Sequence, residues 1–387
     1  MSILIKNARI IDANTDTVGC IGIKKGKIAF IGGNPNEKYD TQIQADNLVV
    51  MPALTDTHCH LRDPGQTQKE SMETGMRAAI TGGYCTLTAM ANTTPVIATP
   101  KLIKNNLTKA KNLGLCELVQ VAACGQNLED KTPTDRQELR KYTNVFSNDG
   151  KTIFSDSFME KLLIDSRELD FVVSTHCQPE SQIVERDLNL LEKTGGNLHI
   201  GHISEKKTVE LIRAAKKKGL KFTCEVTPHH LVGHDCDYAV NPPLLTKIDN
   251  QTLIQAISDG VIDCLATDHA PHTPQDKQNG MAGISNIEYA LQIFLKVFID
   301  NGIPLKRLSE MTSLRPRQIL GLGGGLINVG ETANLIIVDP SSAATIKSDE
   351  MISRSHNTPF DGMKVNGKVI TTIIKGNIIY DNGRFIR

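Results

Sequence analysis

The sequence predicts an α/β fold: a (β/α)8 barrel of the TIM type with a small β-sandwich domain formed by both termini. Two observations predict it. In the middle of the chain, short apolar runs alternate with helical patterns, and both ends consist of short strand-like runs separated by turns. The length of 387 residues suits a large barrel plus a minor domain. We expect residues 1–51 and 330–387 to form the small domain and residues 52–329 to form the barrel.

Eight apolar runs provide the predicted barrel strands. They are residues 53–58, 84–90, 117–122, 143–146, 171–176, 198–202, 221–226 and 262–268. Helical patterns, such as those at 208–218 and 251–258, lie between them. Strands that alternate with helices in this way are typical of βα units that close into a parallel barrel.

The two ends of the chain predict short strands broken by glycine and asparagine turns. The candidate strands are residues 3–5, 8–11, 20–23 and 27–31 at one end and 334–338, 365–374 and 377–380 at the other. Because both ends differ from the middle in the same way, we expect them to assemble into one small sheet domain.

Composition limits the classes of function. The chain has 43 basic and 43 acidic residues, and a net charge of zero argues against a general nucleic-acid binder, which needs a basic field. The nine cysteines form no CxxC pair, and their odd number suits a reducing compartment. No run reaches the ~18 apolar residues of a membrane span. We therefore expect a soluble, cytoplasmic protein without a nucleic-acid or membrane partner.

The strongest local signal is the segment Asp56-Thr57-His58-Cys59-His60. Side chains alternate along a strand, so His58 and His60 should point to the same side with Cα atoms roughly 6.6 Å apart. Two imidazoles at this spacing can share a metal ion, whereas Cys59 should face the other way. An HxH pair can also be merely exposed, but its place at the end of the first predicted strand favours chemistry, because barrel active sites lie at the carboxyl ends of the strands.

Four more candidate ligands end later strands of the predicted barrel. Asp149 follows the fourth strand, His176 the fifth, His202 the sixth and Asp268 the eighth. Each alone could be a loop carboxylate or a hydrogen-bonded histidine. Six such residues on one rim are hard to explain by packing, and a mixture of imidazole and carboxylate ligands suits zinc and neighbouring divalent metals. The sequence therefore predicts a metal-dependent hydrolase.

These segments resemble the bacterial-type (class I) dihydroorotases of the amidohydrolase superfamily, and the resemblance spans nearly the whole chain. The matching segments are DTHCHLRDPG at 56–65, AMANTTPV at 89–96, FSNDG at 146–150, HISEK at 202–206, EVTPHHL at 225–231, NPPL at 241–244, ATDHAPHTP at 266–274, GGGLINVGETANLIIVD at 323–339 and NTPF at 357–360.

The resemblance implies one or two zinc ions per subunit, with two expected. His58, His60 and Asp268 would hold the first ion, and His176 and His202 would hold the second. Asp149 would bridge the two, where many relatives use a carboxylated lysine. Lys151 is the nearby competitor for that bridging role.

The resemblance also implies the reaction, which is the reversible cyclisation of N-carbamoyl-L-aspartate to L-dihydroorotate in pyrimidine biosynthesis. A metal-activated hydroxide would attack the ring amide, and Asp268 would shuttle the proton. The substrate-binding residues that it implies are Arg62, Asn92, Asn241, His272 and Gly283. Gly283 belongs to a loop, 280–283, that would cover the ring.

Two other functions stay open at this point. Another cyclic amidohydrolase, such as an allantoinase or a dihydropyrimidinase, would share the metal chemistry but would not need Arg62 for a substrate carboxylate. A non-catalytic dihydroorotase-like partner of aspartate transcarbamoylase would be expected to lack metal ligands. We expect a homodimer, and an association with aspartate transcarbamoylase also stays open. His229 and His230 are either structural or lie behind the ligands.

Overall fold

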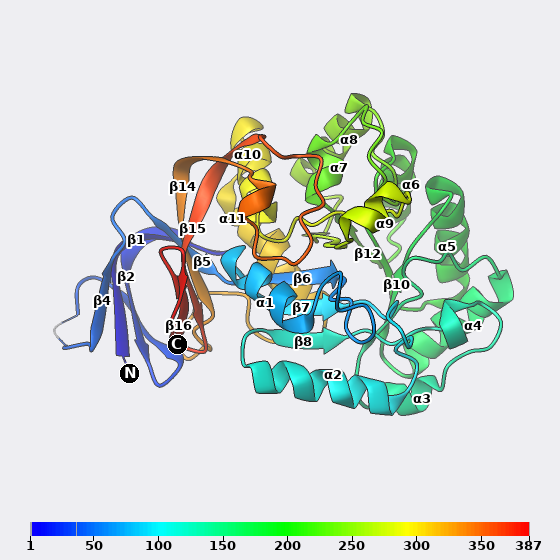
Figure 1. Ribbon diagram of the computed structural model, residues 1–387, viewed down its shortest axis with the longest axis horizontal. Helices are drawn as coiled ribbons and strands as arrows, with labels where there is room; N and C mark the ends of the chain where they lie inside the picture. The colour runs from blue at the N-terminus through cyan, green and yellow to red at the C-terminus, as the bar shows by residue number, and fades with distance from the viewer. Residues whose placement is uncertain (1, 36, 387) are drawn as a thin grey trace.

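The protein is described by a computed structural model covering residues 2–35 and 37–386. A barrel surrounded by helices occupies one side of the molecule, and a sheet formed by both ends of the chain lies beside it (Figure 1). Both chain ends lie on the sheet side, away from the helices α4, α5 and α6. The predicted fold class is confirmed.

Eight parallel strands form the barrel, and each overlaps one of the eight predicted runs. Two groups of paired strands, β6-β7-β8 and β9-β10-β11-β12-β13, follow the order of the chain. Bridges between Ala122 and Phe146 and between Cys59 and His269 join the two groups. The strands are β6 (Leu54–Cys59), β7 (Tyr84–Ala89), β8 (Glu117–Gln120), β9 (Val145–Phe146), β10 (Val172–Thr175), β11 (Leu198–Ile200), β12 (Thr223–Val226) and β13 (Cys264–Leu265).

The first and last strands are joined by hydrogen bonds that also arrange the site. The buried carboxylate of Asp56 accepts from the backbone N–H of Thr267 at 2.9 Å and from its hydroxyl at 2.6 Å. Beyond this point the backbone N–H of Asp268 donates to the carbonyl of His58 at 2.9 Å. Residues more than 200 positions apart in the sequence therefore lie side by side at the carboxyl end of the barrel.

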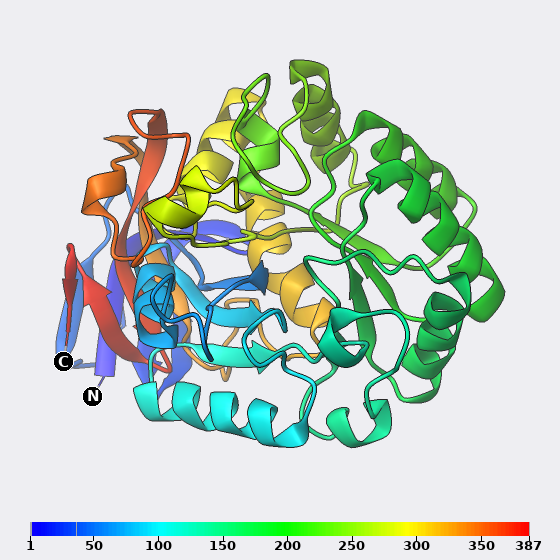
Figure 2. The ribbon, with the colours of Figure 1, turned by 45° about the vertical axis from the view of Figure 1, so that its right-hand side comes forward.

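Helices follow the strands and cover the outside of the barrel (Figure 2). Several begin at the side chains that helix starts favour; the hydroxyl of Thr227, for example, accepts from the backbone N–H of His230. The helices are α1 (Met72–Thr81), α2 (Pro100–Leu113), α3 (Arg136–Leu139), α4 (Asp156–Glu168), α5 (Glu180–Thr194), α6 (Lys206–Lys217), α7 (Pro228–Val232), α8 (Lys247–Ser258), α9 (Pro274–Gln278), α10 (Ala290–Asp300), α11 (Leu305–Ser309) and α12 (Arg315–Ile319), with the short turns η1 (Gln126–Leu128), η2 (Glu310–Leu314) and η3 (Ser348–Glu350).

The two chain ends form one continuous sheet in the order β17-β16-β15-β14-β5-β1-β2-β3, with β4 paired to β1. Ile3, Ile21 and Ile28 from the N-terminal strands share a buried cluster with Leu335 and Ile373 from the C-terminal strands, so the sheet curls over its own apolar face. The strands are β1 (Ser2–Ile11), β2 (Asp16–Lys24), β3 (Lys27–Gly32), β4 (Thr41–Gln44), β5 (Val49–Pro52), β14 (Leu335–Thr345), β15 (Lys364–Ile374), β16 (Asn377–Asp381) and β17 (Arg384–Phe385).

The segment between β14 and β15 leaves this sheet and runs along the mouth of the barrel. There the hydroxyl of Ser355 donates to the carbonyl of Lys69, and the backbone N–H of Arg354 donates to the buried carboxylate of Glu70. Residues that we assign to the small domain thus reach the carboxyl end of the barrel. The limits of 1–51 and 330–387 for this domain stay a proposal.

Two further observations concern the cysteines and the possibility of a membrane-crossing helix. All nine cysteines are free, and only Cys236 is exposed. In the described part of the chain, no helix combines the length and the apolar character that a membrane crossing would require.

Candidate metal centre

Six predicted ligands meet at the carboxyl end of the barrel. His58 lies on β6 and His60 just beyond it, while the other four follow β9, β10, β11 and β13. All six are buried, with at most 7% of their surface exposed. The structure therefore brings together the complete predicted set, namely His58, His60, Asp149, His176, His202 and Asp268.

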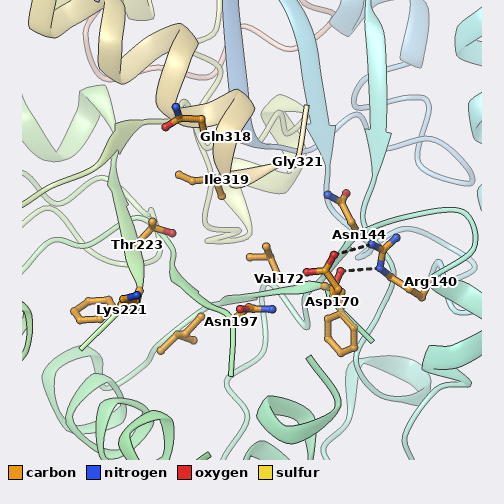
Figure 3. A pocket seen from close by; sticks show the side chains of 13 residues that line it. Arg140, Asn144, Asp170, Val172, Asn197, Lys221, Thr223, Gln318, Ile319 and Gly321 are labelled. Carbon is orange, nitrogen blue, oxygen red and sulfur yellow. Dashed lines mark hydrogen bonds and ion pairs between the residues drawn. The ribbon is translucent and has the colours of Figure 1, made fainter. Parts of the chain in front are cut away.

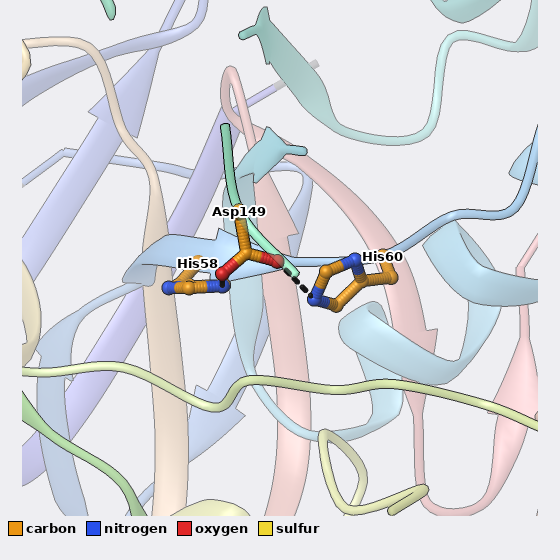
Figure 4. A group of neighbouring side chains, drawn as sticks. All are labelled: His58, His60 and Asp149. Carbon is orange, nitrogen blue, oxygen red and sulfur yellow. Dashed lines mark ion pairs between the residues drawn. The ribbon is translucent and has the colours of Figure 1, made fainter. Parts of the chain in front are cut away.

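The first group of donors consists of His58, His60, Asp149 and Asp268. Asp149 presents its two carboxylate oxygens to two rings, Oδ1 to Nε2 of His58 and Oδ2 to Nε2 of His60, each at 3.3 Å (Figure 4). Oδ1 of Asp268 lies 3.1 Å from Nε2 of His60 and 3.7 Å from Nε2 of His58. Two imidazole nitrogens and two carboxylates thus surround one point.

The second group consists of His176, His202 and again Asp149. Nδ1 of His176 and Nε2 of His202 lie 3.0 Å apart, and each is 3.4 Å from Oδ1 of Asp149. Ligand atoms of His58, His60 and Asp149 lie within 4.8 Å of one another, and so do those of Asp149, His176 and His202. Asp149 is therefore shared by the two groups of candidate ligands.

Three of the four histidines are held from behind by a second hydrogen bond. Nδ1 of His58 faces Oε1 of Glu225 at 2.9 Å, and Nδ1 of His60 faces Oδ1 of Asn92 at 2.8 Å. The side-chain amide of Asn241 lies 3.0 Å from Nε2 of His176. Because the outer nitrogen of each ring is held by this bond, the inner nitrogen points toward the other ligands, which is the usual arrangement of metal-binding histidines.

The electrostatics of the cluster keep both carboxylates ionised. Burial acts to raise the pKa of Asp268, but the hydrogen bond from His60 and the nearby imidazoles outweigh it, so the pKa is lowered. The same opposition lowers the pKa of Asp149 well below its ordinary value, with His58 as the main opposing charge. Burial acts to lower the pKa of His58 and of His202, but the neighbouring carboxylates raise both, that of His58 well above its ordinary value. A metal ion bound here would displace the protons of these rings, because ligands bind a metal in their deprotonated form.

One ring nitrogen tests whether the cluster fits metal ions. Nε2 of His58 is buried and has no hydrogen-bond partner among the described residues. A buried polar atom without a partner is costly, and Nε2 of His58 faces Asp149 and Asp268 at distances too long for a hydrogen bond in good geometry. A metal ion between them would satisfy the nitrogen, so the residues present fit the predicted ligand.

Lys151, the competitor for the bridging role, lies elsewhere. Its side chain is exposed, and its Nζ donates to the carbonyl of Asn127 at 3.1 Å. A carboxylated lysine is thus not placed between the two groups, whereas Asp149 is.

Three residues of the site have backbone conformations that side chains rarely adopt. Arg62 has a φ of 53°, His202 of 27° and Asp268 of 45°. Non-glycine residues with positive φ are uncommon, and they cluster at functional sites where the surrounding structure enforces them. This strain further indicates that these three residues are positioned to bind a ligand and not to pack the barrel.

A cavity of about 260 Å³ opens directly over the cluster. All five predicted substrate-binding residues line it, together with four of the six candidate ligands. The lining residues are His60, Arg62, Asn92, Asp149, Gly150, His176, Asn241, Asp268, Ala270, His272, Met281, Ala282 and Gly283. The cavity is therefore the candidate substrate pocket.

Arg62 is a buried cation without an acidic partner. It is 7% exposed, its Nε donates to the carbonyl of Pro271 at 3.1 Å, and its Nη2 donates to Nε2 of His272 at 3.1 Å. Burial lowers the pKa of Arg62 to about 10, which leaves it charged at neutral pH. Among the described residues it forms no ion pair, since the neighbouring Asp63 pairs with Lys109 instead. A cation in this state is suited to an anionic ligand.

His272 and Gly283 shape the wall beside Arg62. Burial, together with the charges of Arg62 and Lys69, lowers the pKa of His272 to about 3, so its ring is neutral and can accept from Arg62. A Cβ on Gly283 would lie 2.5 Å from the carbonyl oxygen of Ala270 and 2.7 Å from the His272 ring. Only glycine fits there, which explains its place in the pocket wall.

The role of Glu225 was not predicted from the sequence. Its carboxylate is fully buried behind His58, where it also accepts from Nε2 of His199 at 2.9 Å and from the hydroxyl of Thr57. An acidic residue inside an apolar strand was the available signal.

The neighbouring His229 and His230 do not line the pocket. His230 faces the carbonyl of Pro242 at 3.0 Å, next to Asn241, and His229 faces Asn286 at 3.2 Å, so both act on surrounding loops.

A larger cavity, of about 590 Å³, opens at the opposite end of the barrel strands (Figure 3). It lies among Asn144, Val172 and Thr223, at the amino ends of β9, β10 and β12, and the ion pair of Arg140 with Asp170 lines one side. The predicted ligands do not line it, and the chemistry of such barrels occurs at the carboxyl ends. We therefore place the site at the smaller cavity.

Comparison of the sequence with known proteins agrees with this geometry. The profile of the amidohydrolase family matches residues 49–379. The chain is 36% identical over 396 residues to a dihydroorotase of Clostridium botulinum, an alignment that covers 98% of this chain and 100% of that protein. It is 34% identical over 419 residues to a dihydroorotase of Aquifex aeolicus, which covers 98% and 99% of the two chains.

Solved structures with the same fold include two hydantoinases. L-hydantoinase (dihydropyrimidinase) from Arthrobacter aurescens superposes with a TM-score of 0.90 at 23% identity, covering 100% of this chain and 97% of that one. D-hydantoinase (dihydropyrimidinase) from Thermus sp. superposes with a TM-score of 0.88 at 23% identity, covering 99% and 96%. At this identity the likeness establishes the shared fold and carries no information about the substrate.

Proposed function

The chain belongs to the amidohydrolase family and, within it, to the dihydroorotases, and from this premise we propose that it catalyses the reversible cyclisation of N-carbamoyl-L-aspartate to L-dihydroorotate. The observation that carries the proposal is the position of Arg62, a buried cation with no acidic partner among the described residues, beside a pocket that opens over the six candidate ligands. A substrate with both a cyclic amide and a carboxylate fits this combination.

We propose that the cluster holds two zinc ions, one between His58, His60 and Asp268 and one between His176 and His202, with Asp149 shared. The unpartnered Nε2 of His58 and the convergence of both groups on Asp149 support this assignment. Zinc bound there would lower the pKa of water and polarise the amide carbonyl.

In the proposed reaction Asp268 carries the proton. Its carboxylate lines the pocket and is held by His60, so it faces both the ligand cluster and the substrate space. In ring opening it accepts a proton from the attacking water and returns it to the ring nitrogen as the amide bond breaks. In ring closure the same carboxylate takes a proton from the carbamoyl nitrogen.

The remaining pocket residues orient the substrate. Arg62 binds the ring carboxylate through its free N–H groups, with its position fixed by Pro271 and His272. Asn92 and Asn241 each bond to a ligand histidine and also line the pocket, so each can hold the ligand set and contact the substrate. Gly283 allows the backbone to approach the ring closely.

The test is a substrate comparison on one sample of protein of measured zinc content. We expect hydrolysis of L-dihydroorotate to exceed that of dihydrouracil and allantoin by a large factor, and activity to require bound metal. Equal hydrolysis of the three substrates would instead indicate an unspecified cyclic amidohydrolase, and full activity of metal-free protein would refute the metal mechanism.

The assembly of the protein is a separate proposal. We propose a homodimer in solution, and association with an aspartate transcarbamoylase as a further partnership. The presence of all six ligands supports an active subunit rather than a non-catalytic one. Light scattering of the pure protein, and of its mixture with the transcarbamoylase of the same organism, tests both statements.

A further inference from the structure

One lysine side chain joins two loops at the mouth of the pocket. Lys277, on α9, donates from Nζ to the carbonyl oxygens of Ala239 at 2.7 Å, Met281 at 2.9 Å and Gly283 at 3.0 Å. Ala239 belongs to the loop that carries Asn241, and Met281 and Gly283 form the pocket wall. All three hydrogens of the ammonium group are used in these bonds.

The surroundings of Lys277 distinguish it from a surface ion pair. Its Nζ lies 4.1 Å from the centroid of the Tyr238 ring, and the adjacent Asp276 pairs with Lys69 instead. The side chain is half-buried, and burial lowers its pKa to about 8. A cation placed on backbone carbonyls and an aromatic face holds the backbone through charge-assisted hydrogen bonds.

A second side chain converges on the same carbonyl. Asn357, from the segment between β14 and β15, donates from Nδ2 to the carbonyl of Gly283 at 3.0 Å. Its Oδ1 accepts from the backbone N–H of His272 at 2.9 Å and from the hydroxyl of Ser285 at 2.7 Å. The Gly283 carbonyl therefore accepts from Lys277 and Asn357 together, and the wall is held against the loop that carries His272.

We propose that Lys277 is a positioning residue for the substrate, which fixes the Met281–Gly283 wall and the Asn241 loop in the arrangement that encloses the ring. The fit is tight, because a Cβ on Gly283 would already meet Ala270 and His272. Lys277 itself does not line the pocket and acts through the backbone that it binds. The inference rests on the proposed function only because it assumes that a cyclic amide occupies the pocket.

The test replaces Lys277 with methionine, which keeps the length of the side chain but removes the charge and the donors. The matched control is Lys296→Met, since Lys296 forms an exposed ion pair with Asp300 at 2.6 Å on the outer helix α10. We expect Lys277→Met to raise KM by ~10-fold or more while kcat changes by less than ~3-fold. Zinc content should stay at the wild-type level, and amide exchange should increase at 279–283 but not in the barrel strands.

Several results would overturn the inference. They are an unchanged KM, an equal effect of Lys296→Met, or a fall in kcat with KM unchanged. Should Lys277→Met not accumulate as folded protein, Lys277→Gln, which keeps a polar group with fewer donors, is judged by the same criteria. KM is measured with whichever cyclic amide the wild type hydrolyses fastest, so a wild type that prefers dihydrouracil would refute the proposed substrate without affecting this comparison.

Discussion

Nδ1 of His58 lies 2.9 Å from Oε1 of Glu225, on the side of the imidazole ring that faces away from Asp149. The carboxylate is completely buried and also engages His199, so a hydrogen-bonded chain runs from the candidate metal ligand into the interior of the barrel. The bond fixes the ring orientation and directs Nε2 toward Asp149. Glu225 should therefore tune the affinity of the cluster for metal without touching the metal itself.

Glu225→Gln should weaken zinc binding by about 10- to 100-fold, because the neutral amide no longer polarises the His58 ring. Competition against a chromogenic chelator measures this affinity. The control is Glu185→Gln, which changes the same side chain at an exposed position on α5. An unaltered zinc affinity in Glu225→Gln, with the protein folded, would show that the buried carboxylate serves packing alone.

Asp149→Asn tests the number of metal ions. Asparagine keeps the size of the side chain but removes the charge that both donor groups share, so we expect zinc content to fall from about two ions per chain to about one or fewer. Elemental analysis of protein dialysed against a low zinc concentration gives the count. Wild-type protein that binds a single ion under saturating zinc would contradict the bridging role.

Asp268→Asn separates metal binding from proton transfer. The amide oxygen can still act as a ligand but cannot accept the proton, so turnover should fall by ~10² or more while much of the zinc is retained. The measurement is kcat for dihydroorotate together with zinc content of the same sample. Near-normal turnover would exclude Asp268 as the proton carrier.

The barrel could be predicted from the sequence because the pattern that specifies each βα unit lies within one short segment. Each βα unit shows an apolar run followed by a helical pattern, and the carboxyl end of each run marks one rim. The six ligands became predictable for the same reason. The strand order of the continuous terminal sheet was harder to predict. In it β1 pairs in parallel with both β4 and β5, and β5 pairs with β14 from the other end of the chain. No pattern within one strand specifies such partners.

The parts of the site that escaped prediction depend on backbone atoms or on distant segments. Lys277 binds three carbonyl groups, and any residue can supply a carbonyl, so the sequence holds no sign of its partners. Asn357 lies 85 positions from His272, whose backbone it holds. Glu225 carried a visible signal, a carboxylate within an apolar strand, but its partner His58 is specified only by closure of the barrel.

Arg62→Met is the most direct test of the substrate. Dihydroorotate carries a ring carboxylate that dihydrouracil and allantoin lack, and Arg62 is the buried cation that lines the pocket without an acidic partner of its own among the described residues. A charged hydrogen bond to a carboxylate contributes ~1.5–3 kcal/mol, and an unpaired anion in a closed pocket costs more. The variant should therefore lose roughly 10² or more in kcat/KM for dihydroorotate.

The same variant should affect dihydrouracil much less, because that substrate has no carboxylate to bind. Any residual rate with dihydrouracil serves as the internal reference, and Arg213→Met, at an exposed ion pair with Asp259, controls for the loss of an arginine elsewhere. If Arg62→Met slowed both substrates equally, Arg62 would act only by supporting Pro271 and His272. The carboxylate clamp would then be wrong, and with it the reason for preferring dihydroorotate over other cyclic amides.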